Sequence, residues 1–278
     1  MVIRDFLSLL DKDEIILIFS YYFDISKSQV LMNLEKEISN EDKDNIMGII
    51  DKRKKKVPLQ YAIGKWNFYG YDFLIEEGVL IPRPETELLV ENLLKFDTKD
   101  KTLLDICTGS GIIGITGRLE GDFSKVLLSD ISNEAINLSE RNIRKFNLEN
   151  VSVVKSDLFK NISEKFSFIT ANPPYIKRKD LKELSDEVKK EPILSLDGGE
   201  DGIYFYEKII REGRNYLLDN GKLLLEIGYD QKERVNRLLE EFGYINILNI
   251  KDYNGFDRIV IGERGKYVWE FRRNCKTL

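Results

Sequence analysis

Apolar residues recur at helical spacing through the first 56 positions of the chain. The segment holds one glycine, Gly48, and no proline. Its apolar positions lie three or four residues apart and so fall on one face of a helix: Phe6, Leu9, Leu10, Ile15, Ile16 and Phe19. The pattern predicts a small helical unit that ends in a basic run at 52–56, just before Pro58. We interpret this run as a solvated helix end stabilised by the helix dipole; contact with RNA or with an acidic partner is the alternative.

Aromatic residues and glycine replace this pattern between positions 60 and 80. Two short aromatic runs, 66–69 and 71–75, flank Gly70, which is typical of a β-hairpin. From position 83 onward, apolar runs of strand length alternate with amphipathic segments. The predicted strands are 102–106, 126–129, 151–154, 166–171, 222–227, 245–250 and 258–261, and the predicted helices include 133–146 and 231–242.

Strands that are separated by helices form mostly parallel sheets. The last two strands are joined by a short loop, which predicts an antiparallel pair at the end of the sheet. We therefore expect an α/β fold with a doubly wound, Rossmann-like, seven-stranded sheet and a small N-terminal helical domain. The expected division is a helical domain at 1–58, a hairpin linker at 59–82 and the α/β domain at 83–278.

Composition narrows the chemistry more than it narrows the fold. The chain has 278 residues, 42% of them hydrophobic and 33% charged, which is enough for a large core without disulfides. It contains no histidine, which excludes Ser-His-Asp and Cys-His hydrolysis and histidine-ligated zinc, and no metal site is predicted. The two cysteines, Cys107 and Cys275, predict free thiols in the cytosol. The net charge of −5 argues against a chain devoted to nucleic-acid binding.

A glycine-rich turn follows the first predicted strand of the sheet. Glycines at a strand-to-helix turn let a ligand approach the backbone, whereas Gly114 is expected to serve helix–sheet packing. Asp130 follows the next strand, where a carboxylate can accept from ribose hydroxyls. The turn alone fits either a dinucleotide or S-adenosylmethionine. Its candidate cofactor-binding residues are Asp105, Cys107, Thr108, Gly109, Ser110 and Gly111.

Two further carboxylates favour S-adenosylmethionine over NAD. Asp105 stands just before the turn, where it repels a pyrophosphate but can hold a cationic amino group, directly or through water. Asp157 follows the third strand and can accept from an adenine amine while Leu158 packs on the ring. The alternative role of Asp157 is a turn or helix cap. We also place Ile131, directly after Asp130, in the cofactor site.

An Asn-Pro-Pro-Tyr turn follows the fourth predicted strand. The Asn172 side-chain oxygen and the Pro173 carbonyl can accept the two hydrogens of a planar NH2 group, and Pro174 helps to keep the turn rigid. Tyr175 can stack on the flat amide or base that carries this nitrogen. Such a nitrogen is a poor nucleophile, so fixing its hydrogens and aligning it with a methyl donor is the natural catalytic device. These four residues are the predicted catalytic group, and no general base is required. We also place Asn172 in the cofactor site.

With these motifs the sequence resembles the release-factor glutamine methyltransferases, the HemK/PrmC family, over roughly 57–262. The segments that carry the resemblance are 60–64, 80–87, 105–111, 172–176, 191–192, 197–202, 226–228 and 257–258. Pro-Arg-Pro-Glu-Thr-Glu at 82–87 discriminates best, because Asn-Pro-Pro-Tyr is shared with adenine amino-methyltransferases and ribosomal-protein glutamine methyltransferases. Cys107 departs from the glycine usual in the release-factor branch. Trp269 and Phe271 lie beyond the resemblance, in a tail that either folds back or frays.

The resemblance implies methylation of the glutamine amide in the Gly-Gly-Gln motif of class 1 peptide-chain release factors, with S-adenosylmethionine as cofactor and in the cytoplasm. It also implies that the helical domain helps to dock this protein substrate. Arg83, Pro84, Glu85 and Glu191 are expected to line the glutamine pocket together with the turn at 172–175; a salt-bridged loop clamp is the alternative role of Arg83. Neither membrane association nor sequence-specific nucleic-acid binding is expected.

Three other functions stay open at this point. A ribosomal-protein glutamine methyltransferase differs only in its partner. An adenine amino-methyltransferase uses the same turn on a flipped base, but it predicts a basic recognition surface, which the acidic balance of this chain disfavours. A non-catalytic adenosyl-binding module that docks a translation factor does not need the Asn-Pro-Pro-Tyr turn, which is intact here.

Overall fold

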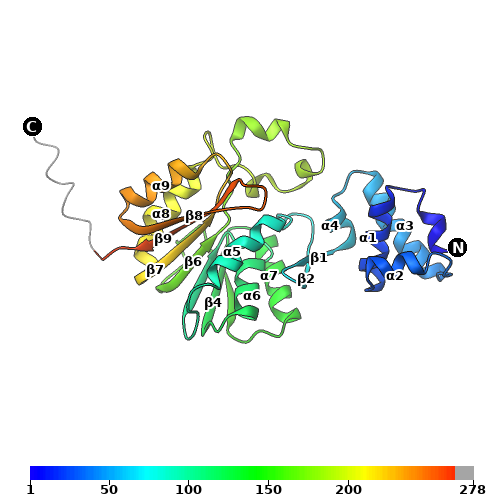
Figure 1. Ribbon diagram of the computed structural model, residues 1–278, viewed down its shortest axis with the longest axis horizontal. Helices are drawn as coiled ribbons and strands as arrows, with labels where there is room; N and C mark the ends of the chain where they lie inside the picture. Colours follow the sequence, from blue (N-terminus) through cyan, green and yellow to red (C-terminus); the bar gives the residue numbers. More distant parts are fainter. Residues whose placement is uncertain (267–278) are drawn as a thin grey trace, which may run out of the picture.

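The computed structural model of the chain describes residues 1–266. Trp269 and Phe271 lie outside the described residues. Figure 1 shows a group of short helices at the N-terminal end beside a larger layered unit of helices and strands. Within residues 1–266, none of the helices has the length and apolar character needed to cross a membrane.

The first 56 residues are mainly helical, as the apolar spacing predicts, and one more short helix, α4 (Leu59–Ile63), lies at the start of the segment predicted to be the hairpin linker. The helices before it are η1 (Ile3–Phe6), α1 (Lys12–Phe23), α2 (Lys27–Met32) and α3 (Asn40–Lys54). Side-chain caps begin the two longest of them: Asp11 accepts from the N–H of Asp13 at 2.9 Å, and Ser39 accepts from the N–H of Asp42 at 3.0 Å. Their apolar faces form one cluster around Phe6 and Phe19, which meet edge to face at 5.2 Å.

A two-stranded hairpin connects these helices to the rest of the chain. Strands β1 (Lys65–Phe68) and β2 (Tyr71–Leu74) pair antiparallel. Both turn residues have positive φ, 53° at Tyr69 and 81° at Gly70, as a tight hairpin turn requires. Trp66 stacks on Tyr21 of α1 at 5.3 Å between ring centroids, so the hairpin is packed against the helical unit.

The larger unit is built on seven strands in the order β5-β4-β3-β6-β7-β9-β8. Their bounds are β3 (Thr102–Ile106), β4 (Lys125–Asp130), β5 (Val151–Lys155), β6 (Phe166–Ala171), β7 (Leu217–Glu226), β8 (Tyr244–Lys251) and β9 (Asp257–Arg264). The pairs among β3 to β7 are parallel, and β9 runs antiparallel to both β7 and β8. The expected Rossmann-like sheet and its antiparallel end are thereby confirmed.

The strand that departs most from its predicted bounds is β7, whereas β4, β5, β8 and β9 differ by one to three residues at an end. β7 begins at Leu217 rather than at 222, because Asn220 and Gly221, which are typical of a turn, lie within the strand. Asn220 takes a φ of 60° there. A register shift between Phe166 and Phe168 of β6 accommodates the irregularity.

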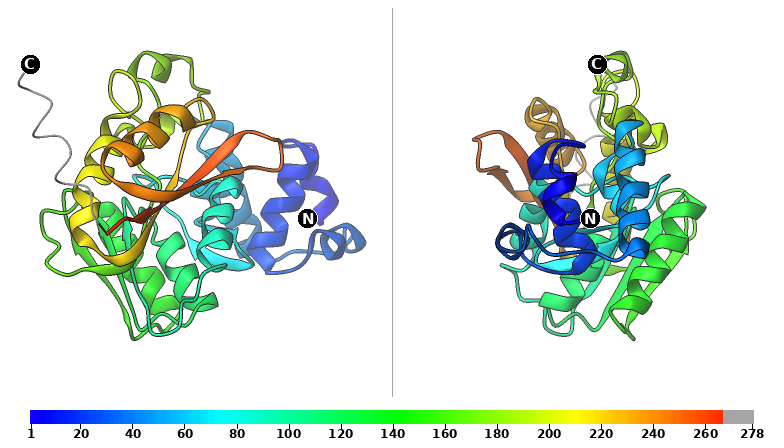
Figure 2. Two further views of the ribbon diagram at one scale, coloured as in Figure 1. Left: turned by 60° about the vertical axis from the view of Figure 1, so that its left-hand side comes forward. Right: turned by 90° about the vertical axis from the view of Figure 1, so that its right-hand side faces the viewer.

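Helices cover both faces of the sheet (Figure 2). They are α5 (Glu87–Leu93), α6 (Ile112–Glu120), α7 (Asn133–Lys145), α8 (Tyr204–Tyr216) and α9 (Lys232–Glu241). Successive strand residues point to opposite faces. Accordingly, Leu103 packs in one apolar cluster with α5 and α6, and Leu104 packs in another with α8 and α9. Neighbouring side chains of β3 are therefore packed on opposite faces of the sheet.

The parallel strands carry their loops to one edge of the sheet. The turns after β3, β4, β5 and β6 meet at this carboxyl edge, and the strand order changes direction between β3 and β6, which is where ligands bind in open α/β sheets. A long connection from β6 to α8 contains only the short helices η3 (Arg178–Glu183), η4 (Val188–Lys190) and η5 (Ile193–Ser195). It lies on the side of the unit nearer the N-terminal helices in Figure 1.

Candidate active site

A cavity of about 710 Å³ opens at this carboxyl edge. It brings together most of the cofactor residues predicted from the sequence, which come from four different strand ends. The predicted residues in its wall are Cys107, Thr108, Gly109, Ser110, Asp130, Ile131, Asp157, Leu158, Asn172 and Pro174. The predicted residues that are not in its wall are Arg83, Pro84, Glu85, Asp105, Gly111, Pro173, Tyr175 and Glu191.

The glycine turn depends on backbone conformations that favour glycine. Gly109 and Gly111 have φ of 58° and 84°, and a Cβ on Gly111 would lie 2.9 Å from Cδ1 of Ile115. Cys107 shares the left-handed conformation with a φ of 57°, at a cost that glycine does not incur. This explains in physical terms why glycine is the expected residue at position 107.

Gly114 serves helix–sheet packing, which confirms the sequence interpretation. A Cβ built there lies 2.2 Å from Cδ2 of Leu128 and 3.2 Å from Cβ of Asp105. Real side chains do not approach so closely, so α6 can sit this near the sheet only with glycine at 114. The close approach positions the first turn of α6 beside the cavity.

Asp105 requires a correction to the prediction of a ligand contact. Its side chain is completely buried and accepts hydrogen bonds from the hydroxyls of Thr108 and Thr170 and from the N–H of Gly114 at 3.4 Å. Burial raises the pKa of this carboxyl group to about 6. The carboxylate therefore connects the glycine turn, through Thr108, to β6, through Thr170. It does not line the cavity.

Asp130 and Asp157 both face the cavity, in different surroundings. The Asp130 carboxylate accepts from the N–H of Gly109 at 2.9 Å and from the N–H of Ser132 at 3.0 Å, and burial raises its pKa. Asp157 is more exposed and pairs with Lys160 at 2.6 Å. Each carboxylate has further acceptor positions available for ligand hydroxyl or amine groups.

Asn172 lies in the cavity wall at the end of β6. Its Nδ2 is 3.4 Å from Oγ1 of Thr86, and both side chains lie beside the carboxyl group of Glu226 at the end of β7, whose ionised form they favour. Glu226 is 1% exposed, and burial raises its pKa to about 7. Sequence reasoning missed Thr86 and Glu226, although Thr86 belongs to the 82–87 motif and Glu226 ends the strand next to β6.

Tyr175 lies in the half-buried layer behind the turn and does not reach the cavity wall. Its carbonyl accepts from Nε2 of Gln231 at 2.9 Å, and the ring packs against the cluster that contains α8 and α9. Burial raises the pKa of the phenol to about 12. The expected stacking of this ring on a substrate therefore has no geometric support here, whereas its contribution to the rigidity of the turn does.

Arg83 and Glu191 form the loop clamp that was the alternative to a pocket role. The Glu191 carboxylate is almost fully buried, accepts from the N–H of Ile81 at 3.0 Å and pairs with the Arg83 guanidinium. These bonds join the segment after β2 to the connection between β6 and α8. Neither side chain lines this cavity, and their expected place in a glutamine pocket stays a prediction.

The remaining wall comes from residues to which no role in the site was assigned from the sequence. Three stretches contribute a large share: the loop before η2 (Pro84–Thr86), the chain around η5 and the start of α8; the ends of β3 and β5 and the first turns of α6 and α7 supply others. The wall residues of the three stretches include Gly78, Val79, Leu80, Pro82, Pro192, Leu194, Tyr204, Phe205 and Lys208. Apolar periodicity cannot reveal such residues, because most of them lie in irregular loops and all of them meet only in the folded chain.

The sequence matches two family models. The model of the methyltransferase small domain matches residues 84–191, and the model of the PrmC N-terminal domain matches residues 10–64. A release factor glutamine methyltransferase of Clostridium botulinum is 43% identical over 239 residues, which cover 83% of this chain and 84% of the relative. The enzyme of the same name from Clostridium acetobutylicum is 39% identical over 256 residues and 90% of each chain. The chain belongs to the release factor glutamine methyltransferase family.

Solved structures agree with this family at the level of the fold. A methyltransferase from Pyrococcus furiosus superimposes with a TM-score of 0.58 at 22% identity, covering 77% of this chain and 99% of that chain. The hMettl16 catalytic domain, in complex with a MAT2A 3′UTR hairpin, gives 0.59 at 16% identity, covering 85% of this chain and 88% of that chain. Sequence identities this low support the shared methyltransferase fold alone.

Proposed function

We propose that this chain transfers a methyl group from S-adenosylmethionine to the side-chain amide nitrogen of the glutamine in the Gly-Gly-Gln motif of class 1 peptide-chain release factors. The observation that carries the proposal is the place of Asn172. Its side chain stands in the wall of the cavity formed by the glycine turn, with its amide nitrogen already bonded inside the protein. Family membership supports the same reaction.

The residues of the cavity fit S-adenosylmethionine. Gly109 brings backbone to the wall without a side chain, and Asp130 keeps free acceptor positions for ribose hydroxyls. Leu158 and the exposed side chain of Ile131 offer apolar surface for a purine ring, with Asp157 next to it. When bound, this cofactor supplies an electrophilic methyl group on a positively charged sulfur, which the acidic wall favours.

In the proposed mechanism the protein orients the side-chain amide of the substrate glutamine and supplies no strong base to remove a proton from its nitrogen. The Asn172 oxygen and the Pro173 carbonyl accept the two N–H groups of the substrate glutamine, which holds the nitrogen in line for methyl transfer. As the new N–C bond forms, the methyl–sulfur bond breaks and the nitrogen becomes strongly acidic. It then loses one proton to water, so a chain without histidine suffices.

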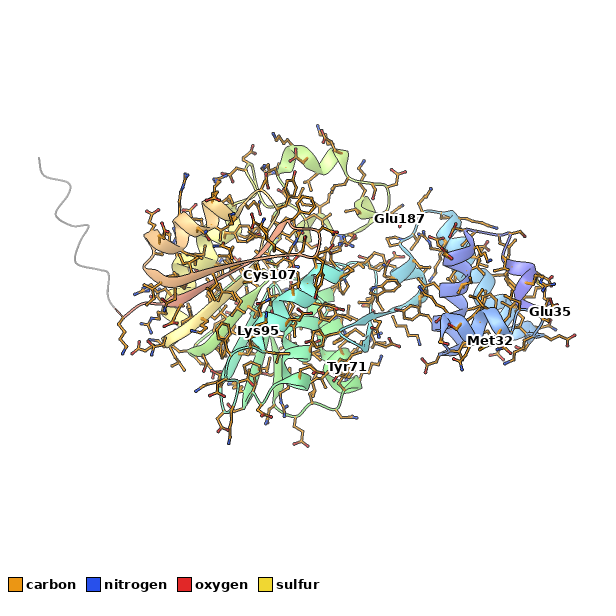
Figure 3. The ribbon with its side chains drawn as sticks, viewed as in Figure 1. Met32, Glu35, Tyr71, Lys95, Cys107 and Glu187 are labelled. Atoms are coloured by element: carbon orange, nitrogen blue, oxygen red, sulfur yellow. The ribbon has the colours of Figure 1, made fainter. Side chains whose placement is uncertain are left out.

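We also propose that residues 1–58 form the docking domain for the protein substrate. Arg53, which is buried near the end of α3, bonds Glu14 of α1 and, at 3.0 Å, Glu187 of the connection between β6 and α8. Figure 3 shows Glu187 on the side of the α/β unit that faces the N-terminal helices. The bridge fixes the helical unit relative to the segment that continues into the cavity wall. The cytosolic location of this reaction stays a prediction.

Methylation of three purified substrates tests the proposal. The protein is incubated with labelled S-adenosylmethionine and a class 1 release factor, a ribosomal protein or an adenine oligonucleotide, and we expect transfer to the release factor alone.

In Asn172→Ala, turnover is expected to fall at least about a hundredfold because the substrate amide loses its orientation, while cofactor affinity changes only a few-fold. Asn249→Ala, at an exposed position on β8, is the matched control and should keep normal turnover. Transfer to another substrate would reassign the partner, and full activity of Asn172→Ala would refute the mechanism.

A further inference from the structure

Glu226 is a buried carboxyl group that the proposed mechanism does not use. It ends β7, and the parallel register pairs Ala171 of β6 with Leu225 of β7, so the next residues, Asn172 and Glu226, are neighbours at the edge of the cavity. Its Oε2 is buried and has no hydrogen-bond partner within the described part of the chain. An incompletely paired buried carboxylate destabilises the fold, which makes a structural role alone a poor explanation.

The bonds around Glu226 determine which way the Asn172 amide faces. An ionised carboxylate only accepts hydrogen bonds. Asn172 favours the ionised form of Glu226, which is what its NH2 group does when it faces the carboxylate. Thr86, which is 2% exposed, completes the arrangement: its hydroxyl accepts from Nδ2 of Asn172 at 3.4 Å and, like Asn172, favours the ionised form of Glu226. With its nitrogen held in this way, Asn172 has its oxygen left as the group that can accept from a substrate.

We propose that Glu226 and Thr86 are positioning residues that hold the Asn172 side chain in the one orientation that accepts an N–H of the substrate amide. The inference rests on the proposed function. An Asn172 side chain turned by 180° would present NH2 to the NH2 of the substrate, and two donors cannot bond each other. The role also connects the 82–87 motif to the reaction, because Thr86 of this motif contacts the Asn172 side chain.

The same arrangement makes turnover depend on pH. Protonated Glu226 can donate, so it would stabilise the turned Asn172 side chain. The groups that face Glu226 are Arg258 of β9, which favours its ionised form, Glu85 of η2, which opposes it, and the phenols of Tyr175 and Tyr206. Because burial raises the Glu226 pKa to about 7, activity should be present above this pH and fall as the pH drops through it.

Three variants of the full chain test the role. Thr86→Val keeps the shape but loses the hydroxyl, Thr86→Ser keeps the hydroxyl, and Glu226→Gln keeps the shape but can donate. We expect Thr86→Val and Glu226→Gln to lower kcat about tenfold to a hundredfold, the size expected for a lost orienting hydrogen bond. KM for the release factor and the Kd for S-adenosylhomocysteine should change less than about threefold. Thr86→Ser should restore most of the kcat that Thr86→Val loses, and the acidic limb of the profile should vanish in Glu226→Gln.

Two results overturn the positioning role while the proposed function stands: wild-type kcat in Thr86→Val and Glu226→Gln, or a loss of kcat matched by equal losses of cofactor affinity and melting temperature. A second measurement needs no substrate. The side-chain NH2 signal of Asn172 in nitrogen-15 NMR, identified by its loss in Asn172→Ser, should shift with pH in the wild type and stay constant in Glu226→Gln. A wild-type signal that does not titrate overturns the inference, whereas a titrating signal in a protein inactive on every substrate overturns the proposed function alone.

Discussion

Adding a single methyl group at Gly114 tests how α6 positions the glycine turn. In Gly114→Ala the new Cβ would lie 2.2 Å from Cδ2 of Leu128, which is fully buried, and 3.2 Å from Cβ of Asp105. Neither neighbour has space to withdraw, so α6 must move away from β3 and β4. Overpacking of this kind costs about 1–3 kcal/mol, from which the better helix propensity of alanine subtracts about 1 kcal/mol.

Melting curves and cofactor titrations measure both consequences of this substitution. A net loss of up to about 2 kcal/mol lowers the melting temperature by up to roughly 8 °C in a protein of this size. Because the moving helix carries the glycine turn with it, affinity for S-adenosylhomocysteine should fall as well. Gly48→Ala is the matched control: it makes the same change in helix α3, where nothing lies within 4 Å of the new Cβ, and should leave cofactor binding unchanged with equal or higher stability. A Gly114→Ala protein that melts and binds like the wild type would refute the reasoning.

Three further predictions concern the strained turn, its buried carboxylate and the bridge to the helical unit. Cys107→Gly removes a left-handed non-glycine residue with φ of 57°, so thermal unfolding should show a gain of about 1 kcal/mol; a lower melting temperature would contradict it. Burial raises the pKa of Asp105 in the folded protein from 3.8 to about 6. The folded protein therefore binds this proton more tightly than the unfolded chain does, and its free energy of unfolding falls as the pH rises through that interval. Urea unfolding at pH 4.5 and 7 should therefore show the wild type losing about 2 kcal/mol relative to Asp105→Asn, and a constant difference would exclude this. Arg53→Lys keeps the charge but cannot bond Glu14, Glu187 and the Val57 carbonyl together, so hydrogen exchange of residues 184–191 should accelerate; unchanged exchange would show that the bridge does not hold this segment.

The regular elements could be predicted from the sequence because periodicity reports burial directly. Leu103 and Leu104 both lie in a run of apolar residues, as expected for a strand that is covered on both faces. The error at β7 has a local cause: Asn220 and Gly221 have the character of a turn, but the residues on either side of them, Leu217 and Lys222, pair with β6 and keep the segment in the strand. Pairing across the sheet outweighs local preference at such a position.

The site could be predicted only where its residues share a motif. Gly109, Asp130 and Asn172 follow strand ends, so the topology alone brings them to the cavity. Asp105 was assigned to the ligand because a motif gives position along the chain and not the direction in which a side chain points. Glu226 was missed for a related reason: its contact with Asn172 depends on the β6–β7 register, which a single sequence does not determine.

Peptide mass spectrometry of a release factor methylated by this protein tests the central claim most directly. After incubation with S-adenosylmethionine, fragment spectra should place one methyl group on the side-chain amide nitrogen of the glutamine in the Gly-Gly-Gln motif. Replacing that glutamine by asparagine in the release factor should abolish the transfer, because the shorter side chain cannot bring its nitrogen to Asn172. A methyl group on any other residue, or undiminished transfer to the asparagine variant, would contradict the account.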